Sequence, residues 1–103
     1  MAAIANLHPV EAEGKDELDS FMFQTVGWNV IESFAACLDR PLFRGELRGR
    51  SVHRDLSYLP TDSDEVEDLF HLVQRVKLAC PSINAVATGA ILSNYQRNRV
   101  ENV

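Results

Sequence analysis

The sequence predicts an α/β protein with a mostly parallel sheet and flanking helices. Short apolar stretches alternate along the chain with longer amphipathic ones. Such alternation is typical of βαβ units, in which successive strands are parallel and joined by right-handed crossovers. We expect strands at residues 2–7, 41–47 and 83–92, helices at residues 21–38 and 61–80, and a last helix from Ser93 to the end of the chain.

The three expected strands differ in composition. Residues 2–7 are small and apolar, and the following His8-Pro9 pair favours a strand end. Residues 41–47 alternate weakly between apolar and polar side chains. Residues 83–92 are almost continuously small or apolar, which is typical of a strand covered on both faces. The acidic stretch at residues 10–19 is interpreted as a loop.

The first expected helix carries an apolar stripe and one unusual glycine. Gly27 within a helix costs about 0.8–1 kcal/mol relative to alanine, so it indicates either close approach of a backbone or ligand, or tolerance in tight packing. The stripe recurs at three- and four-residue intervals. It comprises Phe23, Val26, Val30, Ile31, Phe34 and Leu38.

The second expected helix has clear signals at both ends. Thr61, Asp62 or Ser63 can cap it, and Pro81 follows its end. Acidic residues crowd its start and basic residues its end, which suits the helix dipole, so we assign its carboxylates to neither metal binding nor catalysis. Its expected buried face comprises Val66, Leu69, Phe70, Val73 and Val76.

Composition limits the possible classes of function. The chain has 103 residues, enough for one small domain, and its net charge of −5 argues against general nucleic-acid binding. No apolar run is long enough to span a membrane. Cys37 and Cys80 are expected to be reduced, partly buried thiols of a cytoplasmic protein, and no metal-site spacing is present. His8, His53 and His71 are interpreted as surface or loop residues.

The most distinctive stretch lies between residues 89 and 99. Ser93 followed by Gln96 matches a capping box at a helix start. Arg97 and Arg99 fall in the first turns, where a cation is unfavourable unless an anion binds the free backbone amides. Tyr95 could add an aromatic face or a hydroxyl. The alternative is a solvated surface in which Arg97 pairs with Glu101.

Arginines are also concentrated upstream. Five of the ten basic residues lie between residues 40 and 54. Arg48, Arg50 and Arg54 fall in an expected irregular loop that could contact an anionic partner. A solvated loop is the alternative interpretation.

Several segments resemble one known family. They are Gln-Thr-Val-Gly at 24–27, Pro-Leu-Phe-Arg at 41–44 with Arg48-Gly49 following, Asp-Glu-Val-Glu-Asp-Leu at 64–69, and the long block at 89–103. From about residue 5 to the end, the chain resembles the N-terminal domain of the diphthine–ammonia ligases. The last block carries most of the specificity.

The resemblance implies a PP-loop ATP pyrophosphatase with an adenine-nucleotide α-hydrolase-like fold, present here as a partial domain truncated at both ends and lacking its first strand. It also implies ATP, with Mg²⁺, as cofactor. The family activity is amidation of diphthine on translation elongation factor 2 to diphthamide, with ammonium as the nitrogen source and an acyl-adenylate as intermediate. Neither nucleic acid nor membrane is an expected partner.

The resemblance also suggests site residues, although it assigns no catalytic residue. Two departures matter: the family's phosphate loop, Ser-Gly-Gly-Lys-Asp-Ser, has no counterpart, and Trp28 stands where the family usually has histidine. The alternatives are a non-catalytic fragment that binds a nucleotide or partner weakly, and a related tRNA-modifying PP-loop enzyme. Residues expected to face nucleotide or substrate are Gln24, Thr25, Gly27, Gly89, Ser93, Tyr95, Arg97 and Arg99, and those expected to contact the protein partner are Arg48, Arg50 and Arg54.

Overall fold

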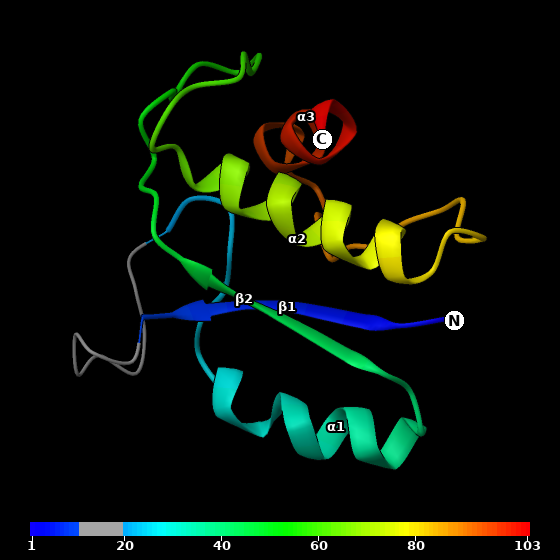
Figure 1. Cartoon of the computed structure of the whole chain (residues 1–103). Helices are drawn as coiled ribbons and strands as arrows, with labels where there is room; N and C mark the ends of the chain where they lie inside the picture. Colours follow the sequence, from blue (N-terminus) through cyan, green and yellow to red (C-terminus); the bar gives the residue numbers. More distant parts are fainter. Residues whose placement is uncertain (11–19) are drawn as a thin grey trace.

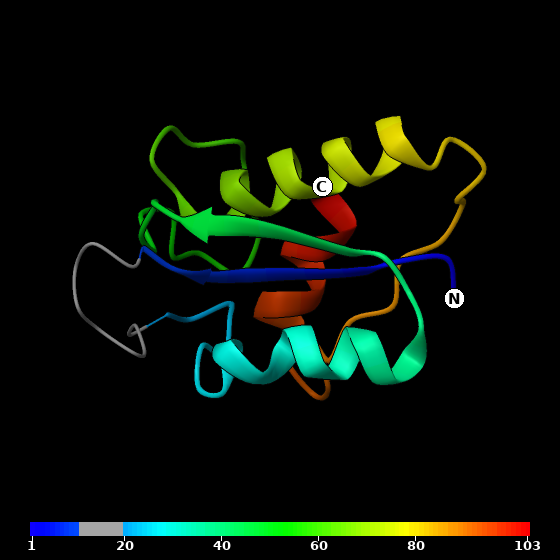
Figure 2. The same ribbon diagram turned by 60° about the horizontal axis from the view of Figure 1, so that its bottom comes forward.

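The computed structural model describes residues 1–10 and 20–103, and the expected acidic loop lies almost entirely outside these residues. A strand pair lies between helices on its two sides (Figures 1 and 2). The elements, in order, are β1 (Ile4–Pro9), a 3-10 turn η2 (Trp28–Val30), α1 (Ile31–Leu38), β2 (Leu42–Leu47), α2 (Glu65–Ala79) and α3 (Asn94–Asn102).

The two strands are parallel, which confirms the predicted α/β class. Ile4 pairs with Leu42, and the register continues to Pro9 and Leu47. The chain crosses between them through η2 and α1. Both strands therefore end at the same edge of the sheet, on the left of Figure 1. This carboxyl edge is where ligands bind in open α/β sheets.

Helix α2 covers one face of the strand pair. Beneath this helix, Gly45 leaves room for the side chain of Leu7, because a Cβ at residue 45 would lie 3.0 Å from Leu7 Cδ2, whereas its distance of 3.7 Å from Leu72 Cδ1 would be an ordinary contact. The predicted buried face is partly wrong. Leu72 is buried whereas Phe70 is 40% exposed. The helix turns Leu72, not Phe70, toward β1 and β2.

The cap of α2 also differs from prediction. Asp64, not one of the three preceding residues, is the N-cap, and its side chain accepts a hydrogen bond from Val66 N. The helix then ends at Ala79, with Cys80 as its C-cap directly before Pro81, which is within one residue of the expected end.

Two small hydrophobic clusters form the core. One is centred on Leu7, Leu47 and Leu72, and the other on Met22, Tyr58 and Val66. Phe23 and Leu69 pack against both clusters and join them. The second cluster brings α3 against α2, since Tyr95, Val100 and Val103 pack on it.

The expected helix at residues 21–38 is wrong in its first half. Residues 20–27 are irregular, with a bend at residues 21–22 and a turn at residues 26–27, and Ser20 Oγ accepts hydrogen bonds from Met22 N and Phe23 N. Gly27 has a φ of 78°, which a helix interior does not allow, so it precedes η2 rather than lying within a helix. Four stripe residues, Val26, Val30, Phe34 and Leu38, are consequently exposed.

The expected strand at residues 83–92 is also absent from the described structure. Ile91 and Leu92 are almost fully exposed, and Leu92 adopts a left-handed φ of 56°. The described sheet contains only β1 and β2. Without a neighbouring strand, the backbone of residues 83–92 has no ladder to join, so apolar composition alone does not make it a strand.

The cysteines and histidines fit their predictions in part. Cys37 and Cys80 are free thiols, but Cys37 is exposed rather than partly buried. His8 lies within β1 and stacks on Trp28 at a ring distance of 5.3 Å. His53 is half-buried in the loop after β2. Among residues 1–10 and 20–103, no helix combines the length and apolarity needed to cross a bilayer.

Candidate functional site at the carboxyl edge

The chain leaves β2 and turns back along the start of α2. Arg50 N donates to Ser63 O, and Glu65 N donates to Arg50 O, both at 2.9 Å. Gly49 makes this approach possible, because a Cβ there would lie 2.6 Å from the carbonyl of Asp64. Residues 48–50 are therefore attached directly to the N-terminus of α2.

A buried carboxylate, Asp64, holds the next part of this loop. Its Oδ2 accepts from Val52 N at 3.0 Å and His53 N at 2.8 Å, while Oδ1 caps the helix at Val66 N. Three backbone N–H groups thus take the place of water around the carboxylate of Asp64, a residue that is only 2% exposed. Hydrogen bonds of this kind offset the cost of burying a charge.

The neighbouring carboxylate, Glu65, is also buried and joins two loops. It accepts from Ser20 Oγ at 2.6 Å and from Met22 N at 3.2 Å. It also accepts from Ser51 Oγ at 2.8 Å. The segment that follows residue 19 and the loop after β2 are consequently fastened to the same helix start.

Arg99 closes the network from α3. Its residue is fully buried, and Nη2 donates to the carbonyls of His53 at 2.5 Å and Asp55 at 2.9 Å. Its Cζ lies 3.4 Å from the ring centroid of Tyr95 and 5.4 Å from that of Tyr58. The guanidinium thus holds the loop through both hydrogen bonds and stacking.

Burial raises the pKa of both tyrosines. For Tyr58 the largest cause is loss of solvent, reinforced by its 2.6 Å hydrogen bond to Glu67 Oε1. For Tyr95 burial also raises the pKa, and the positive charge of Arg99 opposes the shift. Both phenols therefore remain protonated, and Tyr58 acts as a hydrogen-bond donor.

The two predicted anion-binding arginines do not lie together beside the amides at the start of α3. Arg97 points outward and pairs with Glu101 at 2.8 Å, which is the alternative that helical spacing offered. Arg99 lies in the last turn of α3, not beside the amides at its start. The helix dipole suits Arg99 there, because the C-terminal end of a helix favours cations.

The predicted helix start is correct in one half of its capping box. Ser93 Oγ accepts from Gln96 N at 3.3 Å. The Gln96 side chain does not return to the cap, and instead donates to Phe21 O at 3.2 Å. Phe21 also contacts the Tyr95 ring edge-on at 6.0 Å. Phe21 therefore contacts residues near the start of α3.

The remaining predicted substrate-facing residues are more scattered. Thr25 is buried, and its carbonyl accepts from Trp28 N, whereas Gln24 is exposed. Gly27 occupies the left-handed turn before η2. Gly89 is exposed, with no atom within 4 Å of the Cβ that it lacks.

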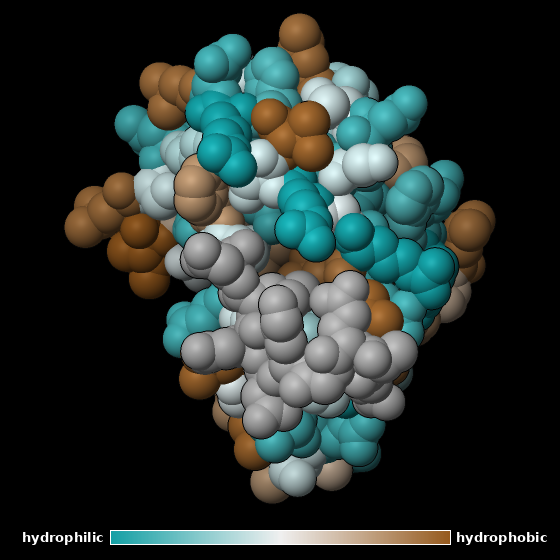
Figure 3. Space-filling view, turned by 90° about the vertical axis from the view of Figure 1, so that its left-hand side faces the viewer, coloured by the Kyte–Doolittle hydropathy of each residue, from teal (hydrophilic) through white to brown (hydrophobic). Residues whose placement is uncertain are grey.

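The three predicted partner-contacting arginines have different environments. Arg48 pairs with Glu46 at 2.6 Å. Arg54 donates to Ser51 O at 2.8 Å and lies over the Phe21 ring at 5.3 Å. Arg50 is exposed beside the start of α2. The view onto this side shows hydrophilic side chains interspersed with several separate hydrophobic ones (Figure 3).

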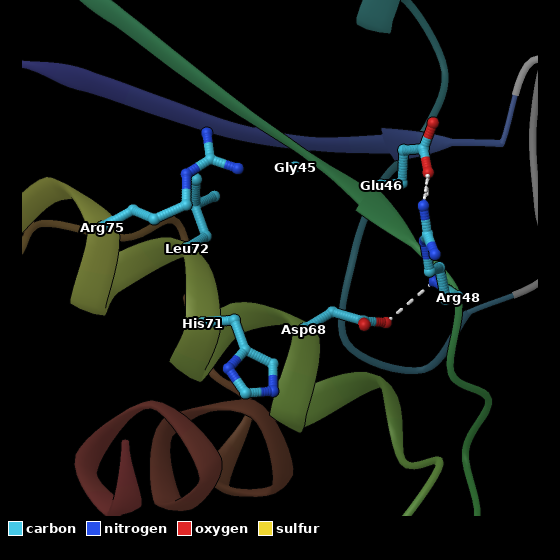
Figure 4. A pocket seen from close by; sticks show the side chains of 7 residues that line it. All are labelled: Gly45, Glu46, Arg48, Asp68, His71, Leu72 and Arg75. Atoms are coloured by element: carbon cyan, nitrogen blue, oxygen red, sulfur yellow. Dashed lines mark hydrogen bonds and ion pairs between the residues drawn. The ribbon is translucent and has the colours of Figure 1, made fainter.

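A shallow hollow of about 170 Å³ lies between β2 and α2, next to this loop. Figure 4 shows Asp68 reaching toward Arg48 and Arg75 reaching across to the strand. The lining residues are Gly45, Glu46, Arg48, Asp68, His71, Leu72 and Arg75.

Sequence reasoning missed the residues that organise this edge. Asp64 and Glu65 were assigned to helix chemistry, and Tyr58 had no assigned role. Their positions at a helix start were visible, but their burial depends on loops distant in sequence. The one sequence signal for a buried N-cap is the group of polar residues at 61–65, which directly precedes the apolar face of α2.

The arginines of α3 already have protein partners in the described structure. The amides at the start of α3 lie beside the Ser93 cap, Arg97 is paired outward, and Arg99 is committed to carbonyls. Within residues 1–10 and 20–103, no group of three or more His, Cys, Asp or Glu is placed to hold a metal. The geometry instead provides a firmly held loop at the carboxyl edge.

Comparison with known proteins gives one consistent match. Over 103 residues the chain is 53% identical to the diphthine–ammonia ligase of Schizosaccharomyces pombe and 50% identical to that of Danio rerio. Over 104 residues it is 47% identical to that of Homo sapiens. In each case the whole of this chain is matched, and the match lies in the N-terminal part of the ligase.

The match covers only part of these relatives. The chain spans 17% of the S. pombe protein, 40% of the D. rerio protein and 39% of the human protein. No family model matches the chain. No solved structure matches it either.

Proposed function

We propose that this chain, which is related over all of its 103 residues to diphthine–ammonia ligases, forms part of an ATP-dependent ligase. The substrate is diphthine on translation elongation factor 2, the product is diphthamide, and the reaction takes place in the cytoplasm. The observation that carries this proposal is an identity of 47–53% along the entire chain. The match covers every residue of the chain.

The proposed reaction converts a carboxylate to a carboxamide in two steps. An oxygen of the diphthine carboxylate attacks the α-phosphorus of ATP, and pyrophosphate leaves. Ammonia then attacks the acyl carbon, AMP leaves, and the ammonia nitrogen loses its extra proton to solvent. Because Arg97 and Arg99 already have protein partners, the proposal assigns neither the phosphates nor Mg²⁺ to these two arginines.

The proposed contribution of this chain is to position a recognition surface. Asp64, Glu65 and Arg99 hold the loop after β2 at the carboxyl edge. Arg50 and Arg54, which this loop carries, are proposed to approach the protein substrate, whereas Arg48 is engaged by Glu46. Residues proposed to face the substrate are Gln24, Thr25, Gly27, Gly89, Ser93 and Tyr95.

A segment exchange tests this proposal. Residues 1–103 replace the matching part of the S. pombe ligase, and the chimera is expressed in cells that lack the native ligase. Elongation factor 2 is then purified and its modified peptide weighed by mass spectrometry. We expect the mass change of a carboxylic acid becoming a carboxamide. A chimera that accumulates as folded protein but leaves only diphthine would refute the proposal.

A second candidate is a non-catalytic module that binds a nucleotide or partner weakly. It is favoured by the lack of a glycine-rich phosphate loop in the 103 residues. Calorimetric titration of the purified chain with ATP separates the candidates. Binding by the isolated chain together with an inactive chimera would favour the module over the ligase part.

A further inference from the structure

The outer edge of β2 is the feature from which we draw a further inference. In a parallel ladder, the backbone groups of successive residues point alternately to opposite sides. Ile4 N donates to Pro41 O at 2.9 Å, which directs the odd-numbered residues of this stretch toward β1. The backbone groups of Arg44, Glu46 and Arg48 therefore face away from β1.

Two charged side chains from α2 occupy this outer edge. Arg75 Nη2 donates to Arg44 O at 2.7 Å. Asp68 Oδ2 accepts from Arg48 N at 2.9 Å and from Gly49 N at 2.8 Å. In Figure 4 the two side chains reach the strand on either side of Glu46.

The spacing of the two residues suits both elements. Asp68 and Arg75 are two helical turns apart, about 10.5 Å along α2. Arg44 and Arg48 are four residues apart, about 13 Å along the strand. The long arginine side chain makes up the difference. Asp68 and Arg75 therefore each bind a backbone group that points outward from the sheet. Neither of these hydrogen bonds joins Asp68 to Arg75.

Another strand adding to β2 would use the Arg44 carbonyl, both backbone groups of Glu46 and the Arg48 amide. Two of these four groups already have side-chain partners. Unprotected strand edges promote association, and charged side chains at an edge oppose it. We propose that Arg75 and Asp68 close the outer edge of β2 against strand pairing with a second copy of this chain.

The test removes the two contacts without removing the apolar stem of the arginine. The variants are Arg75→Met alone and Arg75→Met combined with Asp68→Ala. Arg97→Met is the matched control, because Arg97 is an exposed arginine on α3 that contacts no strand. Arg75→Lys and Asp68→Asn retain a donor and an acceptor, so they should behave like wild type.

Two quantities are measured at protein concentrations from 10 to 300 µM. One is the molar mass, by light scattering after size-exclusion chromatography, and the other is the rate of amide hydrogen exchange at single residues. We expect the double variant to be at least tenfold more prone to dimerise than wild type, with the Glu46 amide protected in the dimer. Arg75→Met, which keeps the Asp68 contacts with the loop, should show the same protection to a smaller extent.

Three results would overturn the proposal. One is a folded double variant that stays as monomeric as Arg97→Met. Another is association that protects the amides of Ala5 and Leu7 on β1 but leaves Glu46 unprotected. The third concerns Arg75→Met, which is the deciding variant if the double variant fails to fold. An Arg75→Met protein with the molar mass of wild type and an unprotected Glu46 amide would contradict closure of this edge.

Discussion

Arg99 Cζ lies 3.4 Å from the ring centroid of Tyr95, one helical turn earlier on α3, and the same guanidinium donates to two carbonyls of the loop after β2. This relationship connects the end of the chain to a loop more than 40 residues away. An arginine in this position acts as a structural anchor for the carboxyl edge.

Replacing this arginine should destabilise the fold far more than replacing its neighbour. Arg99→Met leaves the His53 and Asp55 carbonyls without their charged donor, and we expect a loss of about 2–3 kcal/mol in unfolding free energy. Arg97→Met removes only an exposed ion pair and should leave the unfolding free energy almost unchanged. Urea unfolding followed by circular dichroism measures both, and equal losses would contradict the anchoring role.

Alkaline pH should destabilise the protein through Tyr58, which is buried, and Tyr95, which is partly buried. Their pKa values are raised in the folded state, so below pH about 10 both states keep the protons and stability is unaffected by these groups. Above that pH the unfolded chain loses protons that the folded chain retains, and stability falls by up to about 1.4 kcal/mol per pH unit for each tyrosine.

Urea midpoints between pH 8 and 11 test this, with Tyr58→Phe as the comparison. The variant loses the hydrogen bond to Glu67, so it should be about 1 kcal/mol less stable at pH 8. It should also lose stability less steeply above pH 10. Parallel curves for wild type and variant would show that Tyr58 does not titrate as proposed.

Two glycines should respond oppositely to alanine. Gly49→Ala places a methyl group 2.6 Å from the Asp64 carbonyl, so the loop must move away from α2, with an expected loss of about 2 kcal/mol or more. Gly89→Ala meets no atom within 4 Å and should be neutral or stabilise by up to about 1 kcal/mol.

Thermal unfolding of the two variants is the measurement. A Gly49→Ala protein as stable as wild type would mean that the loop after β2 does not need its close contact with α2.

The purified chain should not release pyrophosphate from ATP. The sequence contains no glycine-rich phosphate loop, and the described arginines near α3 are engaged by Glu101 and by loop carbonyls. A coupled pyrophosphate assay, with and without elongation factor 2 carrying diphthine, checks this. Turnover well above that of an Arg97→Ala control would contradict the prediction.

Some features of this edge were within reach of sequence reasoning. The Ser93 cap and the Arg97–Glu101 pair depend on neighbours within four residues, and both are present. The capping glutamine was predicted to turn back on its own helix. It contacts Phe21 instead, because a loop 75 residues away offers it a carbonyl.

The sequence by itself determined the elements with clear local signals, which are α2 with its charge distribution and the start of α3, and it placed β1 and β2 to within two residues. Tertiary structure decided the rest. Residues 83–92 have the composition of a strand, but a strand forms only where another backbone satisfies its hydrogen bonds, and the described sheet stops at β1 and β2. Likewise, the local sequence predicts Arg99 as an anion ligand. Only the folded loop after β2 supplies the two carbonyls that accept its hydrogen bonds.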